Sequence, residues 1–146
     1  MTDLTLTTER LINATPEKVF DAWLNPDMLK RFMIPGGDAM TVPRAEADAR
    51  EGGRFEIIMK MGDEEMPHRG TYKEISPHKR LVFTWESSAS TEPDSTVTLT
   101  FTPEGSGTHL SLTHVRFPNE TSRANHEMGW GAILSALDGV LIGAEA

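Results

Sequence analysis

The chain has 146 residues, no cysteine and a formal net charge of −8. The lack of cysteine excludes disulfide bonds, thiolate metal sites and cysteine nucleophiles. The acidic balance argues against a nucleic-acid partner, because phosphate contacts need clustered Lys and Arg and the basic residues here are scattered. No stretch approaches 18 apolar residues and the amino end lacks a leader pattern, so we expect one cytoplasmic domain over residues 1–146, without membrane insertion.

One strand and two short helices are expected at the amino end. Apolar and polar residues alternate over residues 4–13, which predicts the first strand. Thr15 suits a helix N-cap and Pro16 suits the first helical position, so a helix follows directly. The pair Asn25-Pro26 ends this helix and starts a second one that continues to Met33.

The middle of the chain alternates with a period of two, which predicts antiparallel strands joined by short turns. Six strands are expected, over residues 42–49, 53–61, 66–75, 80–87, 95–102 and 107–115. The run from Ser87 to Asp94 is small, polar and long for a hairpin connection, so we expect this segment to be mobile.

A long helix is expected from about residue 120 to residue 145. Its apolar stripe is formed by Trp130, Leu134, Leu137 and Leu141, at helical spacing. Four glycines interrupt the helix at positions 129, 131, 139 and 143, and each costs about 1 kcal/mol relative to alanine. They either allow close packing on the sheet or leave volume beneath the helix.

Three stretches of the chain carry a family resemblance. The clearest is a hairpin with the pattern Gly70-x-Tyr72-x-Glu74-Ile75-x-Pro77-x-x-Arg80-Leu81. This hairpin belongs to a block that starts at Gly53-Arg54-Phe55 and ends at Trp85, and the other two stretches run from Arg10 to Pro26 and from His126 to Leu137. In this order and spacing the chain resembles the homologues of the activator of heat-shock-protein-90 (Hsp90) ATPase. These belong to the START-like, helix-grip superfamily, often labelled SRPBCC.

The resemblance implies an α+β helix-grip fold. A curved antiparallel seven-stranded sheet would have two short helices after its first strand and the long carboxy-terminal helix over its concave face. It also implies a deep cavity between sheet and helix, which the superfamily uses for lipids, sterols, polyketides and other apolar molecules. Members often carry Trp in the second short helix, where this chain has Phe32, so we expect that wall to differ.

Residue parity along the strands indicates which side chains face the cavity. We expect an apolar pocket of roughly 300–1,000 Å³, the usual size of a small-molecule site. The eight methionines favour a pocket, because flexible thioethers suit adaptable apolar surfaces. The alternative is that the same side chains fill a core. The candidate ligand-binding residues are Phe32, Phe55, Ile57, Met59, Tyr72, Phe83, Trp85, Leu99, Leu112, His114, His126 and Trp130.

Two histidines are the polar candidates on this wall. His114 follows its strand's apolar face, and His126 lies one turn before Trp130 on the helix stripe. A neutral imidazole there could bind a ligand oxygen or act as a general base. The alternative for His126 is a structural hydrogen bond that ties the helix to the sheet. The other histidines are isolated, with no ligand spacing, so we expect neither a metal nor another cofactor.

Three functions from different classes are compatible with these features. The first is non-enzymatic binding of a small hydrophobic ligand, lipid-like or aromatic and polyketide-like. The second is a cyclase- or hydrolase-like enzyme in the same cavity, with His114, His126 or Tyr72 as acid or base. The third is a protein-interaction module that activates a chaperone ATPase. A chaperone partner and a homodimer both stay open.

Overall fold

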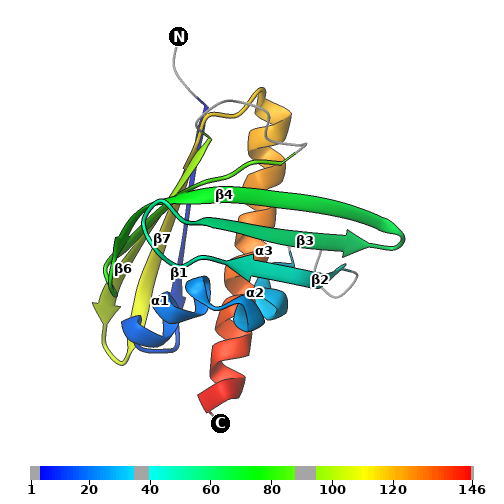
Figure 1. The fold of residues 1–146 in the computed structure, drawn as a ribbon. Coiled ribbons are helices and arrows are strands. Elements are labelled where there is room, and N and C mark those ends of the chain that lie inside the picture. Colours follow the sequence, from blue (N-terminus) through cyan, green and yellow to red (C-terminus); the bar gives the residue numbers. More distant parts are fainter. Residues whose placement is uncertain (1–3, 35–39, 88–94, 146) are drawn as a thin grey trace.

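The computed structural model describes residues 4–34, 40–87 and 95–145, with side chains as far as Leu141 (Figure 1). The elements are β1 (Thr5–Ile12), α1 (Pro16–Leu24), α2 (Pro26–Phe32), β2 (Met40–Ala47), β3 (Arg54–Met61), β4 (Glu64–Ser76), β5 (Arg80–Thr84), β6 (Thr96–Glu104), β7 (Gly107–Val115) and α3 (Glu120–Glu145). This order confirms the predicted α+β helix-grip fold. The mobility predicted for the run from Ser87 to Asp94 falls almost entirely outside the described residues. None of the described helices is both long enough and apolar enough to cross a bilayer.

The two short helices begin where the sequence predicts. The Thr15 hydroxyl accepts a hydrogen bond from the Lys18 amide at 3.4 Å, and Pro16 opens α1. The Asn25 side chain accepts from the amide of Asp27 at 2.9 Å and so caps α2. Each cap satisfies a backbone donor that the helix itself leaves without a partner, which fixes where the helix starts.

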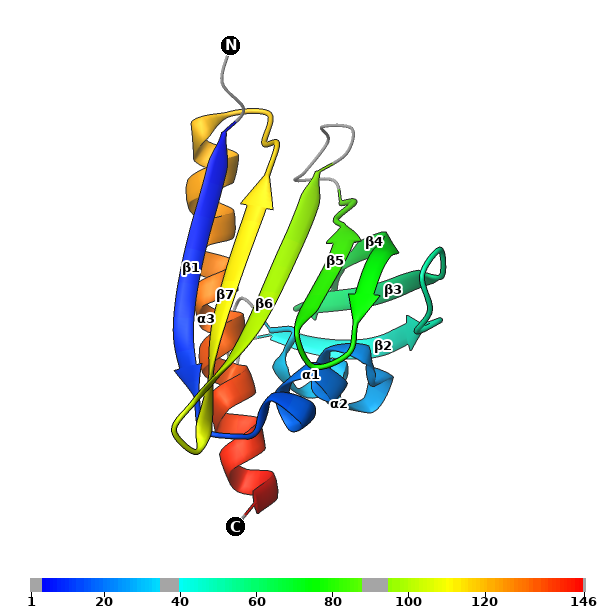
Figure 2. The ribbon, with the colours of Figure 1, turned by 90° about the vertical axis from the view of Figure 1, so that its left-hand side faces the viewer.

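The seven strands form one antiparallel sheet with the order β1-β7-β6-β5-β4-β3-β2. Figure 1 shows that the sheet curls, so that β2, β3 and β4 run across the direction of β1, β6 and β7. α3 lies along the concave face, behind β1 and β7 in Figure 2, and contacts β1 and α2. α1 and α2 lie at the open side of the curl, so the enclosed space has the sheet, α3 and two short helices as its walls.

The curl depends on the long strand β4. Its first part pairs with β3 and its last part pairs with β5, and the register shifts between Tyr72 and Glu74. At Gly70 the backbone passes so close to its neighbours that an added Cβ would overlap the Thr84 carbonyl oxygen and crowd the Phe55 ring. A glycine in a strand interior often marks a close backbone approach, and Gly70 is such a glycine.

The predicted packing of α3 is confirmed. Trp130 is 2% exposed, and Leu134, Leu137 and Leu141 are also buried against the concave face. The two explanations offered for the helix glycines fail at Gly139, which is exposed and would meet nothing within 4 Å if it carried a Cβ. Gly131 likewise has no neighbour within 4 Å of an added Cβ, so close packing does not require it.

A buried carboxylate joins α3 to the end of β1. Asp138 is 6% exposed, and its Oδ1 accepts hydrogen bonds from the Asn13 backbone amide at 2.9 Å and the Asn13 side-chain amide at 3.2 Å. The Arg10 guanidinium, 42% exposed, lies 3.4 Å from the other carboxylate oxygen. The contacts with Asn13 are the stronger ones, because they are shorter and Arg10 is screened by solvent.

Replacing Gly70 by alanine is expected to lower the free energy of unfolding by about 3 kcal/mol, the upper end for overpacking, since the obstacle is backbone that cannot rotate away. Gly139→Ala is the matched control. It adds the same methyl group at a position with no neighbour within 4 Å, and it should raise the free energy of unfolding by up to about 1 kcal/mol. Urea unfolding followed by circular dichroism measures both. Equal effects of the two variants would contradict the close backbone approach assigned to Gly70.

Replacing Asp138 by alanine is expected to cost about 2–3 kcal/mol, because it removes the buried carboxylate that accepts both Asn13 hydrogen bonds, and hydrogen bonds to a charged group contribute about 1.5–3 kcal/mol. Arg10→Ala removes the exposed partner of the same carboxylate and should cost less than about 1 kcal/mol. The two variants are compared by the same unfolding measurement. A larger loss for Arg10→Ala would show that the ion pair, and not the clamp on Asn13, stabilises this junction.

Candidate functional site

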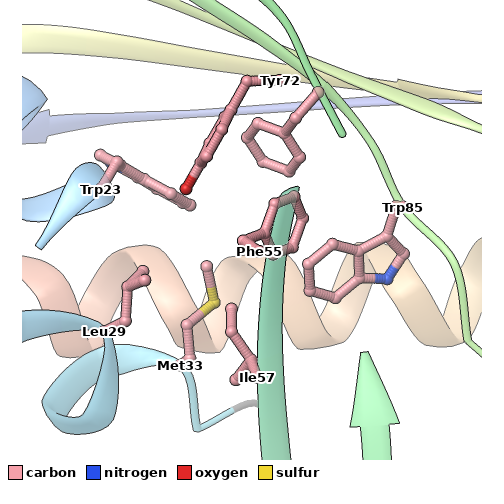
Figure 3. A pocket seen from close by; sticks show the side chains of 8 residues that line it. Trp23, Leu29, Met33, Phe55, Ile57, Tyr72 and Trp85 are labelled. Carbon is pink, nitrogen blue, oxygen red and sulfur yellow. The ribbon is translucent and has the colours of Figure 1, made fainter. Parts of the chain in front are cut away.

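An apolar hollow lies where α1 and α2 meet the curled sheet (Figure 3). Its volume is about 10 Å³. It is lined by Trp23 of α1, Leu29 and Met33 of α2 and its cap, Phe55 and Ile57 of β3, Tyr72 of β4, Phe83 of β5, and Trp85 just beyond β5. No charged side chain is among these eight residues.

The structure gathers part of the predicted wall and places the rest elsewhere. Phe55, Ile57, Phe83 and Trp85 line the hollow as proposed from strand parity, and Tyr72, another candidate, lines it as well. The remaining candidates are not on its lining: Phe32, Met59, Leu99, Leu112, His114 and Trp130 are buried in the core, and His126 is half-buried on α3. The predicted volume of roughly 300–1,000 Å³ is wrong for this structure, since side chains fill almost all of the space.

Three lining residues were missed by sequence reasoning, namely Trp23, Leu29 and Met33. They come from α1, α2 and the C-cap of α2. The helical spacing of apolar residues did predict which faces of the two helices point inward. Which of those side chains reaches the sheet depends on how each helix is seated. Phe32, the predicted wall of α2, instead packs edge-on against Trp23 at a ring distance of 5.1 Å.

Aromatic rings account for most of the lining. Phe55 lies at the centre, with ring distances of 5.3 Å to Tyr72, 5.4 Å to Phe83 and 6.2 Å to Trp85. The pair with Phe83 is T-shaped, which suits the opposed charges of ring edge and ring face. Trp85 in turn contacts Trp130 of α3 at 4.8 Å, so the cluster extends from the hollow to the helix.

The wall also carries polar atoms without a partner. The indole nitrogens of Trp23 and Trp85 are buried and make no hydrogen bond to the protein in the part of the chain described. An indole N–H can only donate, and a buried donor left unpaired costs about 1–3 kcal/mol. The Tyr72 hydroxyl points towards Trp23 in Figure 3, and burial raises the pKa of Tyr72, so the phenol keeps its proton.

His114 lies behind this wall in a hydrogen-bonded chain. Trp130 Nε1 donates to His114 Nδ1 at 3.0 Å, so this imidazole nitrogen carries no proton. The proton of the neutral ring is therefore on Nε2, which lies 2.6 Å from the Ser95 hydroxyl. Burial, with a smaller effect of His126, lowers the pKa of His114 to about 3. His114 does face α3, as predicted, but both of its ring nitrogens form hydrogen bonds within the core.

Two further histidines are fixed by backbone carbonyls. His126 Nδ1 donates to the Ser122 carbonyl at 2.7 Å, so its hydrogen bond is within α3 and does not reach the sheet. His68 Nδ1 donates to the Met66 carbonyl at 2.9 Å, and its ring stacks on Trp85 at 5.0 Å. Burial lowers the pKa of both, to about 4 for His68. The described residues contain no group of three metal-ligating side chains.

Lowering the pH from 6.5 to about 5 is expected to destabilise the protein. His114 and His68 have folded-state pKa values of about 3 and about 4, below the ordinary value of 6.5 that they regain on unfolding. The unfolded chain therefore binds protons that the folded chain does not. Stability is full above pH 6.5 and falls as the pH drops towards the folded-state pKa values. Each such histidine contributes a slope of up to about 1.4 kcal/mol per pH unit.

Urea unfolding at a series of pH values measures this slope. His114→Gln is the control, because the amide can donate and accept but does not titrate in this range. Its slope should be smaller than that of the unmodified protein by the contribution of one histidine. An unchanged slope would mean that His114 is protonated in the folded protein as readily as in the unfolded chain.

The fold is shared with solved structures from several bacteria. A crystal structure of a protein from Chromobacterium violaceum is 25% identical, with a TM-score of 0.81 over 93% of this chain and 95% of that chain. An AHSA1-like protein from Aeromonas hydrophila, solved by solution NMR, is also 25% identical, with a TM-score of 0.81 and coverage of 97% and 94%. A protein from Mesorhizobium loti is 26% identical, with a TM-score of 0.76 and coverage of 94% and 96%. No curated protein matches the chain.

The family comparison agrees with these structures. Residues 13–141 match the family described as "Activator of Hsp90 ATPase homolog 1-like protein". The match takes in every described element from α1 to β7 and α3 as far as Leu141. The chain therefore belongs to the family of Activator of Hsp90 ATPase homolog 1-like proteins, with the START-like helix-grip fold.

Proposed function

We propose that the protein binds a small, mostly aromatic ligand in the hollow between α1, α2 and the curled sheet. The observation that carries this proposal is a wall of eight uncharged side chains, two of which hold buried indole donors without a protein partner. Small-molecule sites typically combine an apolar lining with a few polar groups. A structure that needed only a core would place apolar side chains at these two positions, because unpaired buried donors destabilise it.

Binding requires the wall to open. A hollow of about 10 Å³ is at the lower limit for a single water, so a ligand must take space that side chains now fill. Met33 points between Leu29 and Phe55 in Figure 3. Its unbranched thioether changes rotamer more easily than the rings opposite, and it lies at the end of a helix of only seven residues. We therefore expect Met33 to change rotamer when a ligand enters the hollow.

An enzyme in this hollow is less well supported. A cyclase or hydrolase needs an acid or base beside its substrate. His114 does not line the hollow and has both ring nitrogens engaged, by Trp130 and Ser95. The raised pKa of Tyr72 favours a hydrogen-bond donor over a base.

Interaction with a chaperone is the second candidate, and the family description carries it, since it names an activator of Hsp90 ATPase. The discriminating measurement is the ATPase rate of a purified chaperone with and without this protein. A stimulated rate, together with no effect of any apolar ligand on thermal stability, would favour the partner function over the ligand-binding function.

Ligand binding is tested by differential scanning calorimetry with a panel of small aromatic compounds. A true ligand at 100 times its Kd should stabilise the folded protein by about 2.7 kcal/mol, seen as a rise in Tm. Met33→Ala should lower stability by about 2–5 kcal/mol and yet bind the same compound more tightly, since no side chain has to be displaced.

Met40→Ala is the control for that variant. Met40 is buried but does not line the hollow, so its loss should destabilise the protein without improving affinity. If no compound in the panel raises the Tm of the unmodified protein or of Met33→Ala, the ligand-binding function is refuted.

A further inference from the structure

We propose that one end of β2, β3 and β4 binds a soft monovalent cation, Cu(I) or Ag(I), through thioether sulfur atoms. The ligands are the side chains of Met40, Met59, Met61 and Met66. These are four of the eight methionines of the chain, and none of them lines the hollow. The site is therefore separate from the proposed ligand-binding function and can be tested independently of it.

The strand register brings the four methionines together on one face of the sheet. Met40 of β2 lies opposite Met61 of β3, and Met59 of β3 lies opposite Met66 of β4. Met59 and Met61 are two residues apart on one strand, so their side chains point to the same face. Opposite residues of an antiparallel pair have Cβ atoms about 4.5–5.5 Å apart, a distance that long, flexible thioethers can span. The four side chains are therefore consecutive neighbours.

The methionine face is the concave one, and it reaches the surface at this end of the sheet. Met59 is 1% exposed and Met40 is also buried, so the core holds both. Met66 is half-buried and Met61 is 43% exposed. Figure 1 shows that the hairpin of β3 and β4 extends well beyond α3 here. The thioethers thus run from the core to the solvent, which provides both fixed ligands and a path of entry.

Thioether sulfur selects a particular class of metal ion. It is a soft ligand, and soft ligands prefer Cu(I), whereas carboxylates and carbonyls suit Mg(II), Ca(II) and Mn(II). No three His, Asp or Glu side chains meet at a metal-binding distance among the described residues. The chain has no cysteine, so methionine is the soft ligand that it offers. The expected cation is therefore Cu(I) or its redox-stable analogue Ag(I).

The charges around the methionines also favour a cation. Glu64 lies opposite Met61 in the register of β3 and β4, and the adjacent Asp63 and Glu65 are acidic and exposed. Lys60, the neighbour of Met61 along β3, points to the other face of the sheet by strand alternation. The whole chain carries a net charge of −8. The electrostatic field at this end therefore attracts positive ions.

Isothermal titration calorimetry of the full chain with Ag(I), in a chloride-free buffer at pH 7, tests the site. Met61→Leu and Met66→Leu each remove a sulfur atom and keep a similar apolar volume. Loss of a residue that merely supports a metal ligand costs about 10–100-fold in affinity, so each variant should bind Ag(I) at least about tenfold more weakly. The double variant should not bind. Met128→Leu is the matched control, because Met128 is 76% exposed on α3, and its affinity should be unchanged.

A second titration at pH 5 separates thioethers from histidines. A thioether carries no proton at either pH, so the affinity for Ag(I) should be about the same. A surface imidazole with the ordinary pKa of about 6.5 is protonated at pH 5 and releases its metal. Methionine labelled with ¹³C in its methyl group gives the direct readout. Ag(I) should shift the methyl resonances of Met40, Met59, Met61 and Met66 and leave that of Met128 in place.

The possible outcomes decide each part of the proposal. No binding of Ag(I), or binding that persists in the double variant, overturns the site. A shift of Met128 equal to that of Met59 shows adventitious surface binding only. Loss of affinity at pH 5 overturns the thioether ligands, and equally tight binding of Zn(II) overturns the preference for a soft cation. Met61 and Met66 are not fully buried, so we expect their variants to fold, and circular dichroism checks this. If the double variant unfolds, the methyl spectra of the unmodified protein still decide.

Discussion

The close approach of two backbones at Gly70 is the constraint on which the rest of the structure depends. Because Gly70 has no side chain, β4 can pass against the Thr84 carbonyl and let the Phe55 ring lie across it. β4 then joins two halves of the sheet that run in different directions, and the concave side closes around α3. Phe55 of β3, whose ring lies over Gly70, also contacts Tyr72 of β4, so this close approach lies beside the centre of the hollow.

A second set of contacts fixes the helix against that sheet. Ser95, His114 and Trp130 form a hydrogen-bonded chain from the start of β6 through β7 to α3. Asp138 holds the same helix to the end of β1, through Asn13. One group of bonds therefore lies near the middle of α3 and the other two turns further along. His114, the leading candidate for a polar ligand contact or a general base in the sequence, has a structural role here, because Ser95 and Trp130 hydrogen-bond to both of its ring nitrogens.

The sequence predicts the fold better than the site. Period-two strands, capped short helices and the Gly70 hairpin are local signals, and each is found where it was expected. Strand parity placed Phe55, Phe83 and Trp85 on the side of the sheet where the hollow lies. It could not give the volume, which depends on how rings from separate elements fill the common space. The contact between Asp138 and Asn13 joins residues 125 positions apart, and a lone Asp in an apolar helix carries no local sign of its partner. The glycines of α3 suggested close packing or free volume beneath the helix, but Gly139 faces outward. Which side of a helix faces the sheet is decided by packing between elements.

The three tryptophans have a consequence for spectroscopy. Trp130 lies 6.4 Å from Trp23 and 4.8 Å from Trp85, so all the indoles of the chain belong to one cluster. At such separations their electronic transitions couple, and excitation passes among them before emission. The near-ultraviolet circular dichroism and the intrinsic fluorescence of this protein should therefore behave as the signal of a single composite chromophore. That chromophore reports on the junction of α1, α3 and the curled sheet.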